Sequence, residues 1–270
     1  MSKLSRKLIA EPGKKLKLAD IDPDFCAGIK SKQAAARLLQ KNIARLAELQ
    51  YLLYAEKKRA LLLVYQAMDA GGKDGTIRHV MTGLNPQGCH VVPFKAPAGI
   101  ETEHDYLWRI HRLAPAFGEI GIFNRSHYED VLVVRVHRLV PRAVWSRRYD
   151  QINAFERMLT ESGTTILKFF LHISQKEQKQ RFEERVQDSS KNWKISPADF
   201  EDRKRWKDYM AAYEDAINLC STPWAPWFVI PADKKWFRDL AVSEIIAETL
   251  EGFKLRYPKP AMDLTGVKVE

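Results

Sequence analysis

The sequence is poor in cysteine and in long apolar runs. Its three cysteines, Cys26, Cys89 and Cys220, are odd in number and lack the spacing of metal ligands, so neither a disulfide framework nor a cysteine-based zinc site is expected. No apolar run approaches the ~20 residues of a membrane helix, and the first residues lack the apolar core and cleavage site of a signal peptide. We therefore expect no membrane partner and, by default, a cytoplasmic location.

Linkers and repeats are also absent from the sequence. No stretch rich in Pro, Gly or Ser divides the chain, so we expect a single domain over residues 1–270. The chain carries 44 Lys and Arg against 34 Asp and Glu, a net charge of +10, which favours a polyanionic partner such as nucleic acid, a membrane surface or a phosphate-rich small substrate. Residues 131–149 hold five arginines and no acid, a pattern that an ordinary solvated face would also explain.

The apolar pattern predicts an α/β fold. Residues 31–57, within an N-terminal helical segment of about 1–58, have apolar residues at steps of three and four, which indicates an amphipathic helix. Because five further runs are apolar throughout and the stretches between them can hold crossover helices, we expect a five-stranded parallel sheet in a three-layer sandwich. The predicted strands are 60–66, 90–94, 119–123, 164–173 and 226–230. A charged, mostly helical stretch at about 175–218 has the size of a lid over a phosphate site.

A glycine-rich turn joins the first predicted strand to a predicted helix, in AMDAGGKDGTIRHV at 67–80. This is the arrangement of a P-loop, in which backbone N–H groups and a helix N-terminus bind phosphate and Lys73 adds a charge. The match is partial, because Ala67 replaces the first glycine and Asp74 replaces the Ser or Thr that would bind magnesium. A purely structural turn is the alternative. The predicted phosphate-binding residues of this segment, besides Lys73, are Ala70, Gly71, Gly72, Asp74, Gly75, Thr76 and Arg78.

Three side chains beside this turn suggest chemistry. Asp69 would repel a phosphate unless a metal lies between them or the acid positions the attacking group, and stabilising an Asx turn is its alternative role. Asn124 and Arg125 follow the third predicted strand. Because the carboxyl ends of parallel strands flank one crevice, both would face Lys73, and Arg125 could bind phosphate oxygens bidentately. An ordinary surface arginine is the alternative for Arg125.

Helical spacing adds two pairs of arginines. Arg181 and Arg185 are four apart in the predicted lid and share a helix face, so both could close over phosphates. Arg109 and Arg112 are three apart and would extend a basic channel. A solvated helix of mixed charge is the alternative for the first pair, and a helix pinned by Trp108 is the alternative for the second.

Six further sequence blocks follow AMDAGGKDG along the chain: PFKAP at 93–97, LWRIHRLAP at 107–115, FNRSHYEDVLV at 123–133, LHIS at 171–174, NWK at 192–194 and PADKKWFRDL at 231–240. In these blocks and their order, over about residues 12–263, the chain resembles the polyphosphate kinase 2 family. FNRSHYEDVL is similar to class III of that family, whose members use inorganic polyphosphate to phosphorylate nucleoside monophosphates and diphosphates.

The resemblance implies a thymidylate-kinase-like P-loop fold with a helical lid. It also implies magnesium-dependent transfer of the terminal phosphoryl group of polyphosphate to AMP and ADP, giving ADP and ATP, in a reaction that could be reversible. A homo-oligomer, dimer or tetramer, is expected, with polyphosphate, AMP, ADP and ATP as partners. Two rival functions stay open: an ATP-dependent nucleotide kinase, which would leave Asp69 and the basic excess unexplained, and a nucleic-acid-binding module, which would not need a P-loop. We expect no nucleic-acid partner.

The resemblance also assigns roles to residues. Asp69 and Lys73 are the acid and lysine of the P-loop, Asn124 and Arg125 occupy Walker B-like positions, and Arg185 is the lid arginine, with Arg181 as the fallback. Other classes of the family have Asp in place of Asn124. Because this chain lacks that carboxylate, the remaining groups that would bind Mg²⁺ are Asp69, the substrates' phosphates, water and Glu129. The remaining predicted contacts are with phosphate at Lys95, Arg109, Arg112 and Arg181, and with the acceptor nucleotide at Glu129, Asp130 and Lys194.

Overall fold

A single parallel sheet forms the centre of the computed structural model, which describes residues 2–265 and 267. Its strand order is β2-β3-β1-β4-β5, so the first strand in the chain is the middle one. The strands are β1 (Ala60–Gln66), β2 (Cys89–Pro93), β3 (Ile120–Asn124), β4 (Thr164–His172) and β5 (Trp227–Pro231). Every predicted strand is present with ends within one residue of the prediction, and the predicted parallel sheet is confirmed.

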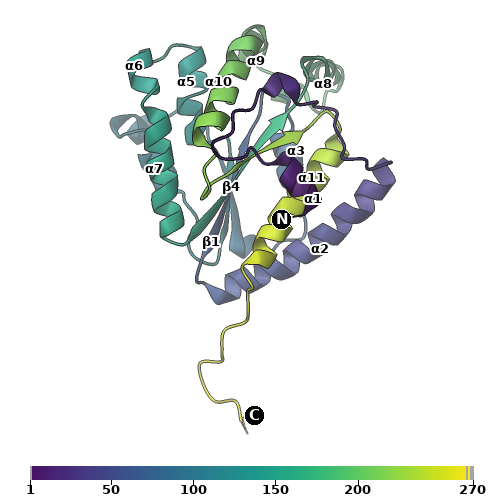
Figure 1. Ribbon diagram of the computed structural model, residues 1–270, viewed down its shortest axis with the longest axis vertical. Coiled ribbons are helices and arrows are strands. Elements are labelled where there is room, and N and C mark those ends of the chain that lie inside the picture. Colours follow the sequence, from purple (N-terminus) through teal and green to yellow (C-terminus); the bar gives the residue numbers. More distant parts are fainter. Residues whose placement is uncertain (1, 266, 268–270) are drawn as a thin grey trace.

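Helices cover both faces of this sheet, as expected for a three-layer sandwich (Figure 1). In β1, Leu61 and Leu63 pack into the core on one face and Leu62 and Val64 into the core on the other, because successive side chains of a strand alternate. Helices packed on the first face are α1 (Lys3–Leu8), α2 (Lys32–Glu56), α3 (Lys73–Val80) and α11 (Lys235–Gly252). Those on the second face are α4 (Trp108–Arg112), α5 (Val133–Val136), α7 (Arg148–Glu161) and α10 (Trp206–Cys220).

The remaining helices lie in the connections between these elements. They are α6 (Arg142–Trp145), α8 (Gln175–Gln187), α9 (Pro197–Lys204) and the 3₁₀ turns η1 (Leu18–Asp20), η2 (Pro86–Gly88), η3 (Gly99–Glu103), η4 (His127–Asp130) and η5 (Asn192–Lys194). Within the described residues, no helix is both long and apolar enough to pass through a bilayer.

The N-terminal segment contains α1, the 3₁₀ turn η1 and the long helix α2. The predicted amphipathic helix is α2, which begins after Ser31, whose hydroxyl accepts a hydrogen bond from the Ala34 N–H, and ends at Lys57 in the left-handed conformation. Between α1 and α2 the chain passes along β5, where the Ala10 N–H donates to the Trp227 carbonyl at 2.8 Å. This segment therefore closes the outer edge of the sheet.

The projecting segment in the structure is shorter than the lid predicted at 175–218. Its last helix, α10, buries an apolar face against the sheet, and the ring of Tyr213 lies 4.4 Å from that of Phe170 on β4. That helix is the crossover that leads to β5. The part that projects beside the strand ends is α8, η5 and α9, or residues 175–205, at the top of Figure 1.

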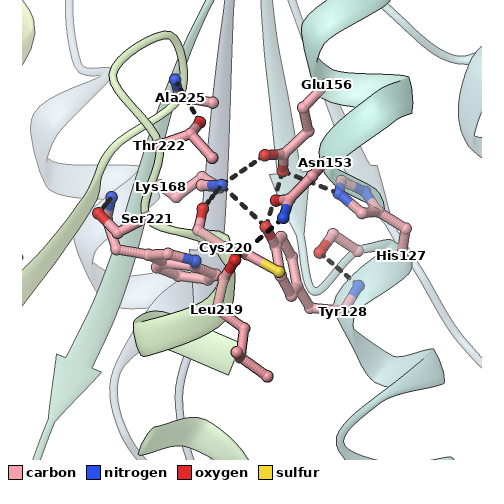
Figure 2. Close-up of polar contacts among 12 residues, drawn as sticks. His127, Tyr128, Asn153, Glu156, Lys168, Leu219, Cys220, Ser221, Thr222 and Ala225 are labelled. Carbon is pink, nitrogen blue, oxygen red and sulfur yellow. Dashed lines mark hydrogen bonds and ion pairs between the residues drawn. The ribbon is translucent and has the colours of Figure 1, made fainter. Parts of the chain in front are cut away.

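One buried polar network ties the second face to the sheet (Figure 2). Lys168, fully buried on β4, directs its three N–H donors at the hydroxyl of Tyr128 (2.8 Å), the carbonyl of Cys220 (2.7 Å) and the carboxylate of Glu156. Glu156 also accepts a bond from the Tyr128 hydroxyl at 2.9 Å and lies 3.1 Å from Nε2 of His127. Burial opposes the charge of Glu156, but Lys168 and His127 outweigh it and lower the pKa of the carboxyl. The network thereby joins β4, α7, α10 and η4.

Breaking this network from one side should destabilise the fold. We expect Lys168→Met to lower the free energy of unfolding by about 3–5 kcal/mol, because it leaves the Glu156 carboxylate buried without its cation. Replacing both residues, as Lys168→Met with Glu156→Gln, should cost less than the sum of the single changes. Urea unfolding measures both values, and Lys179→Met, in an exposed pair with Glu183, is the matched control. A loss for Lys168→Met no larger than for the control would contradict this account.

Candidate active site

The turn after β1 has a backbone that suits a phosphate. Ala70 and Gly72 have positive φ values of 59° and 102°, and α3 begins directly after Gly72. A Cβ at Gly72 would lie 1.9 Å from Nη1 of Arg238, so this position needs glycine for space as well as for φ. The N–H groups of Ala70 and Gly72 make no hydrogen bond to any described residue. Free N–H groups beside a helix N-terminus form an anion-binding loop.

A cavity of about 680 Å³ opens in front of this loop, where β1, β2 and β3 end. It gathers most of the side chains that sequence reasoning selected. Those in its lining are Asp69, Ala70, Gly71, Gly72, Lys73, Asp74, Gly75, Lys95, Arg109, Asn124, Arg125, Glu129, Asp130, Arg185 and Lys194. Segments far apart in the sequence thus meet at one edge of the sheet, as the topology of a parallel sheet requires.

Lys73 is a buried cation in the cavity lining. Its Nζ donates to the carbonyl of Ala67 at 2.9 Å, which holds the side chain across the mouth of the loop. Burial, with a contribution from the nearby Arg125, lowers the pKa of Lys73 to about 8, against the opposing effects of Asp69 and Glu129. The lysine is therefore charged at neutral pH but has lost much of its hydration, a state that favours an incoming anion.

Arg125 lies between two acids. Its Nη2 is 2.7 Å from Oδ1 of Asp69 and its Nη1 is 3.7 Å from Oε2 of Glu129. Its backbone is in the left-handed region, at φ 65°, and its N–H donates to the Tyr65 carbonyl, so the strand end aims the side chain. Burial raises the pKa of Glu129, while Arg125 and Lys73 oppose the rise. The cavity thus holds its own counter-charges, which an anionic ligand must displace.

The carboxylates fit Mg²⁺ only in combination with a ligand's phosphates. Among the described residues, no group of three His, Cys, Asp or Glu could hold a metal ion alone. Mg²⁺ in kinases is commonly bound by one or two carboxylates, by waters and by substrate phosphates, and Asp69 and Glu129 can supply that share. Asp74 has another partner, since its Oδ1 accepts a hydrogen bond from the Asn124 amide at 2.7 Å.

A family model described as "Polyphosphate kinase 2 (PPK2)" matches residues 29–258. The chain belongs to the polyphosphate kinase 2 family. It is 53% identical over 256 residues to the AMP/ADP-polyphosphate phosphotransferase of Meiothermus ruber, covering 94% of this chain and 96% of that protein. It is 47% identical to the ADP-polyphosphate phosphotransferase of Rhodopseudomonas palustris, covering 88% of this chain and 86% of that protein. The crystal structure of polyphosphate kinase 2 from Arthrobacter aurescens TC1 superposes with a TM-score of 0.93 at 44% identity, covering 98% and 94% of the two chains.

The structure places some predicted site residues of this polyphosphate kinase 2 chain elsewhere. Arg181 is buried, and its N–H donors bind Glu177 and the carbonyls of Ala70, Gly71, Ala232 and Asp233. A guanidinium has five N–H donors, so none is left for a phosphate. Arg181 therefore has no free donor for a phosphate in this structure, whereas Arg185 lines the cavity, and its role as the lid arginine stays a prediction.

Thr76, Arg78 and Arg112 are also outside the cavity lining. The Thr76 hydroxyl donates to the Gly72 carbonyl at 3.1 Å within α3. Arg78 is exposed, and Arg112 lies over the ring of Trp108 at 4.5 Å. Arg109, by contrast, reaches the lining but is buried and donates to the Lys95 carbonyl, so Arg109 and Arg112 do not form one basic channel.

Sequence reasoning missed several lining residues. Phe94, Val133, Val134 and Leu139 make part of the wall apolar, while Trp193 and Asp199 come from the lid. Asp199 accepts hydrogen bonds from both the N–H and the hydroxyl of Ser196, which is the pattern of a helix cap. Its sequence context therefore indicates capping and not a place in the cavity lining. Burial, with the charge of Asp69, raises its pKa.

Phosphate binding should weaken as pH rises through the pKa of Lys73. The cation is present below about pH 8 and is lost above it, so the affinity of the free protein for tripolyphosphate should fall across that range. Calorimetric titration between pH 7 and 9 measures the fall. Lys73→Arg keeps its charge throughout and also corrects for titration of the probe. An identical fall in wild type and Lys73→Arg would contradict the assignment of Lys73.

Proposed function

We propose that this protein transfers the terminal phosphoryl group of inorganic polyphosphate to AMP and ADP, with Mg²⁺, to give ADP and ATP. The observation that carries this proposal is the meeting of Lys73, Arg125 and Asp69 at the mouth of a phosphate-binding loop. The names of the relatives from Meiothermus ruber and Rhodopseudomonas palustris support these donor and acceptor classes.

Phosphoryl transfer asks for in-line positioning and for cations that neutralise the spreading charge, rather than for covalent chemistry from the protein. Lys73 and the free loop N–H groups hold the donor's terminal phosphates. Arg125 exchanges part of its contact with Asp69 for the acceptor phosphate, and Arg185 approaches from α8. Asp69 and Glu129 would hold Mg²⁺, which when bound would neutralise charge on the bridging phosphate oxygens.

The acceptor nucleotide would occupy the part of the cavity beyond Arg125. Phe94, Val133, Val134 and Leu139 offer an apolar wall suited to a base. Asp130 lies in the same lining, where burial raises its pKa to about 6 although Arg148 and Arg109 oppose the rise. Lys194 lines the cavity from the lid, with its Nζ 5.1 Å from the centroid of the Trp193 ring, and would contact the acceptor nucleotide.

A second cavity, of about 580 Å³, adjoins the first at Leu139 and suits the rest of the donor chain. Four arginines and one acid, Asp208, are its charged lining residues. The arginines are Arg135, Arg138, Arg142 and Arg205. Arg135 donates to the carboxylate of Asp215, and Arg205 donates to the Val136 carbonyl. The guanidinium groups of Arg138 and Arg142 bond no described residue. The arginine-rich segment of the sequence thus presents two uncompensated cations beside the active site.

The proposal is tested by incubating the protein with polyphosphate, Mg²⁺ and AMP and separating the nucleotides by chromatography. Formation of ADP and ATP without added ATP supports the proposal. Equal phosphorylation of AMP from ATP without polyphosphate would favour the nucleotide-kinase alternative, and displacement of polyphosphate by oligonucleotides at equal charge would favour the nucleic-acid alternative. The homo-oligomer and the cytoplasmic location stay predictions, the first open to sedimentation analysis.

Glu129 should help this protein accept AMP as well as ADP. AMP is one phosphate shorter, so its α-phosphate must reach the position of the ADP β-phosphate, and an acid beside Arg125 could organise that gap through an ion or water. We expect Glu129→Gln to reduce kcat/KM for AMP at least tenfold more than for ADP, a difference of about 1.4 kcal/mol. Steady-state rates at saturating polyphosphate measure both, and an equal effect on the two acceptors would contradict this role.

Arg138 and Arg142 should act only on long donors. Removing both charges, as Arg138→Ser with Arg142→Ser, should raise the KM for polyphosphate of tens of units about tenfold, by analogy with lost counterion release from nucleic acid. The KM for tripolyphosphate and for ADP should change less than about twofold, because these ligands fit within the first cavity. The double variant Arg37→Ser with Arg157→Ser, on exposed helix faces, controls for net charge. The same rise for short and long donors would contradict this path.

A further inference from the structure

Helix α8 donates hydrogen bonds to the carbonyls of three successive residues in the phosphate loop, the turn that follows β1. Nε2 of Gln178 donates to the Asp69 carbonyl at 2.9 Å, and Nη1 of Arg181 donates to the carbonyls of Ala70 (3.0 Å) and Gly71 (3.1 Å). Gln178 and Arg181 are three residues apart and therefore share one face of the helix. In a planar trans peptide the C=O and the following N–H point in opposite directions, so these bonds turn the N–H groups of Ala70 and Gly72 away from α8.

Gln178 also contacts α9. Nη1 of Arg203, in α9, donates to Oε1 of Gln178 at 2.8 Å and to the Gln175 carbonyl at 2.8 Å. The Gln178 side chain is fully buried, with Arg203 of α9 bonded to its oxygen and the Asp69 carbonyl bonded to its nitrogen. An amide turned by 180° would set oxygen against the Asp69 carbonyl and nitrogen against the guanidinium, so both contacts require the same orientation.

The two α8 residues differ in what fixes them. Arg181 has all its donors satisfied by Glu177 and by backbone carbonyls outside the lid, so its hold on the loop does not depend on α9. Gln178 depends on Arg203, which lies outside the cavity lining, whereas Asp199 on the same short helix lines the cavity. The position of α9 is thus connected through one amide to the backbone of Asp69.

We propose that Gln178 is a positioning residue that couples the docking of α9 to the geometry of Asp69 in the phosphate loop. When Arg203 holds Oε1, the amide is oriented to hold the Asp69 carbonyl, and the Asp69 carboxylate stays in register with Arg125. When α9 leaves, the amide is free to turn and the carbonyl loses its donor. The catalytic part of this inference rests on the proposed function, and the loop coupling does not.

The first test follows the loop without using activity. Hydrogen exchange of a peptide covering residues 67–73 should become at least about threefold faster in Arg203→Met and in Gln178→Glu, which keeps the shape but lacks the amide donor. Lys204→Met, which removes the neighbouring exposed cation of α9, is the matched control and should leave the exchange unchanged. Exchange unchanged in Arg203→Met, in a protein with unchanged thermal stability, would overturn the coupling even if the wild type is an active enzyme.

The second test is a double-mutant cycle on the reaction. Each single change should lower kcat about tenfold, because small misplacement of a reacting group costs up to ~10²-fold, and should leave the KM for nucleotide within about twofold. The double variant should be no slower than Gln178→Glu alone, since both act through one amide. Additive losses, or losses in KM alone, would overturn the positioning role. An inactive wild type whose loop exchange still responds to Arg203→Met would refute the proposed function and retain the coupling.

Discussion

The direction of three carbonyl groups, those of Asp69, Ala70 and Gly71, determines the rest of the site. A loop that offers its N–H groups to phosphate must turn its carbonyls the opposite way, and a buried carbonyl without a partner costs about 1–3 kcal/mol. Gln178 and Arg181 supply those partners from α8. Behind the loop, the buried Arg238 leaves room only for glycine at position 72. The phosphate loop is therefore shaped as much by distant arginines as by its own sequence.

The second constraint is electrostatic. The cavity gathers acids and bases in direct contact, with Arg125 between Asp69 and Glu129, and with Lys73 buried beside them. This pairing stabilises the cavity without a ligand, and it leaves Arg125 able to exchange a carboxylate for a phosphate. Because burial has lowered the pKa of Lys73, a bound phosphate gains more from that charge than it would at a solvated lysine. In this account, a phosphate that binds in the site also replaces a carboxylate contact of Arg125.

Local patterns in the sequence predicted the strands and the loop, while contacts between distant segments escaped prediction. Continuous apolar runs sufficed for a sheet buried on both faces, and the glycine-rich turn with Lys73 indicated the loop at the N-terminus of α3 that we propose as the phosphate site. Helical spacing indicated that Arg181 and Arg185 share a face. It could not show that Arg181 contacts carbonyls of the loop while Arg185 lines the cavity. The charge of the predicted lid likewise hid the apolar face of α10, and nothing local linked Lys168 to Glu156.

A crystal structure of the protein with polyphosphate and Mg²⁺ would test the central claim most directly, because it shows where the terminal phosphates lie. The account predicts them within hydrogen-bond distance of the Ala70 and Gly72 N–H groups and of Nζ of Lys73, with the carbonyls of residues 69–71 still bonded to Gln178 and Arg181. Terminal phosphates bound away from the loop, or loop carbonyls turned toward them, would contradict it.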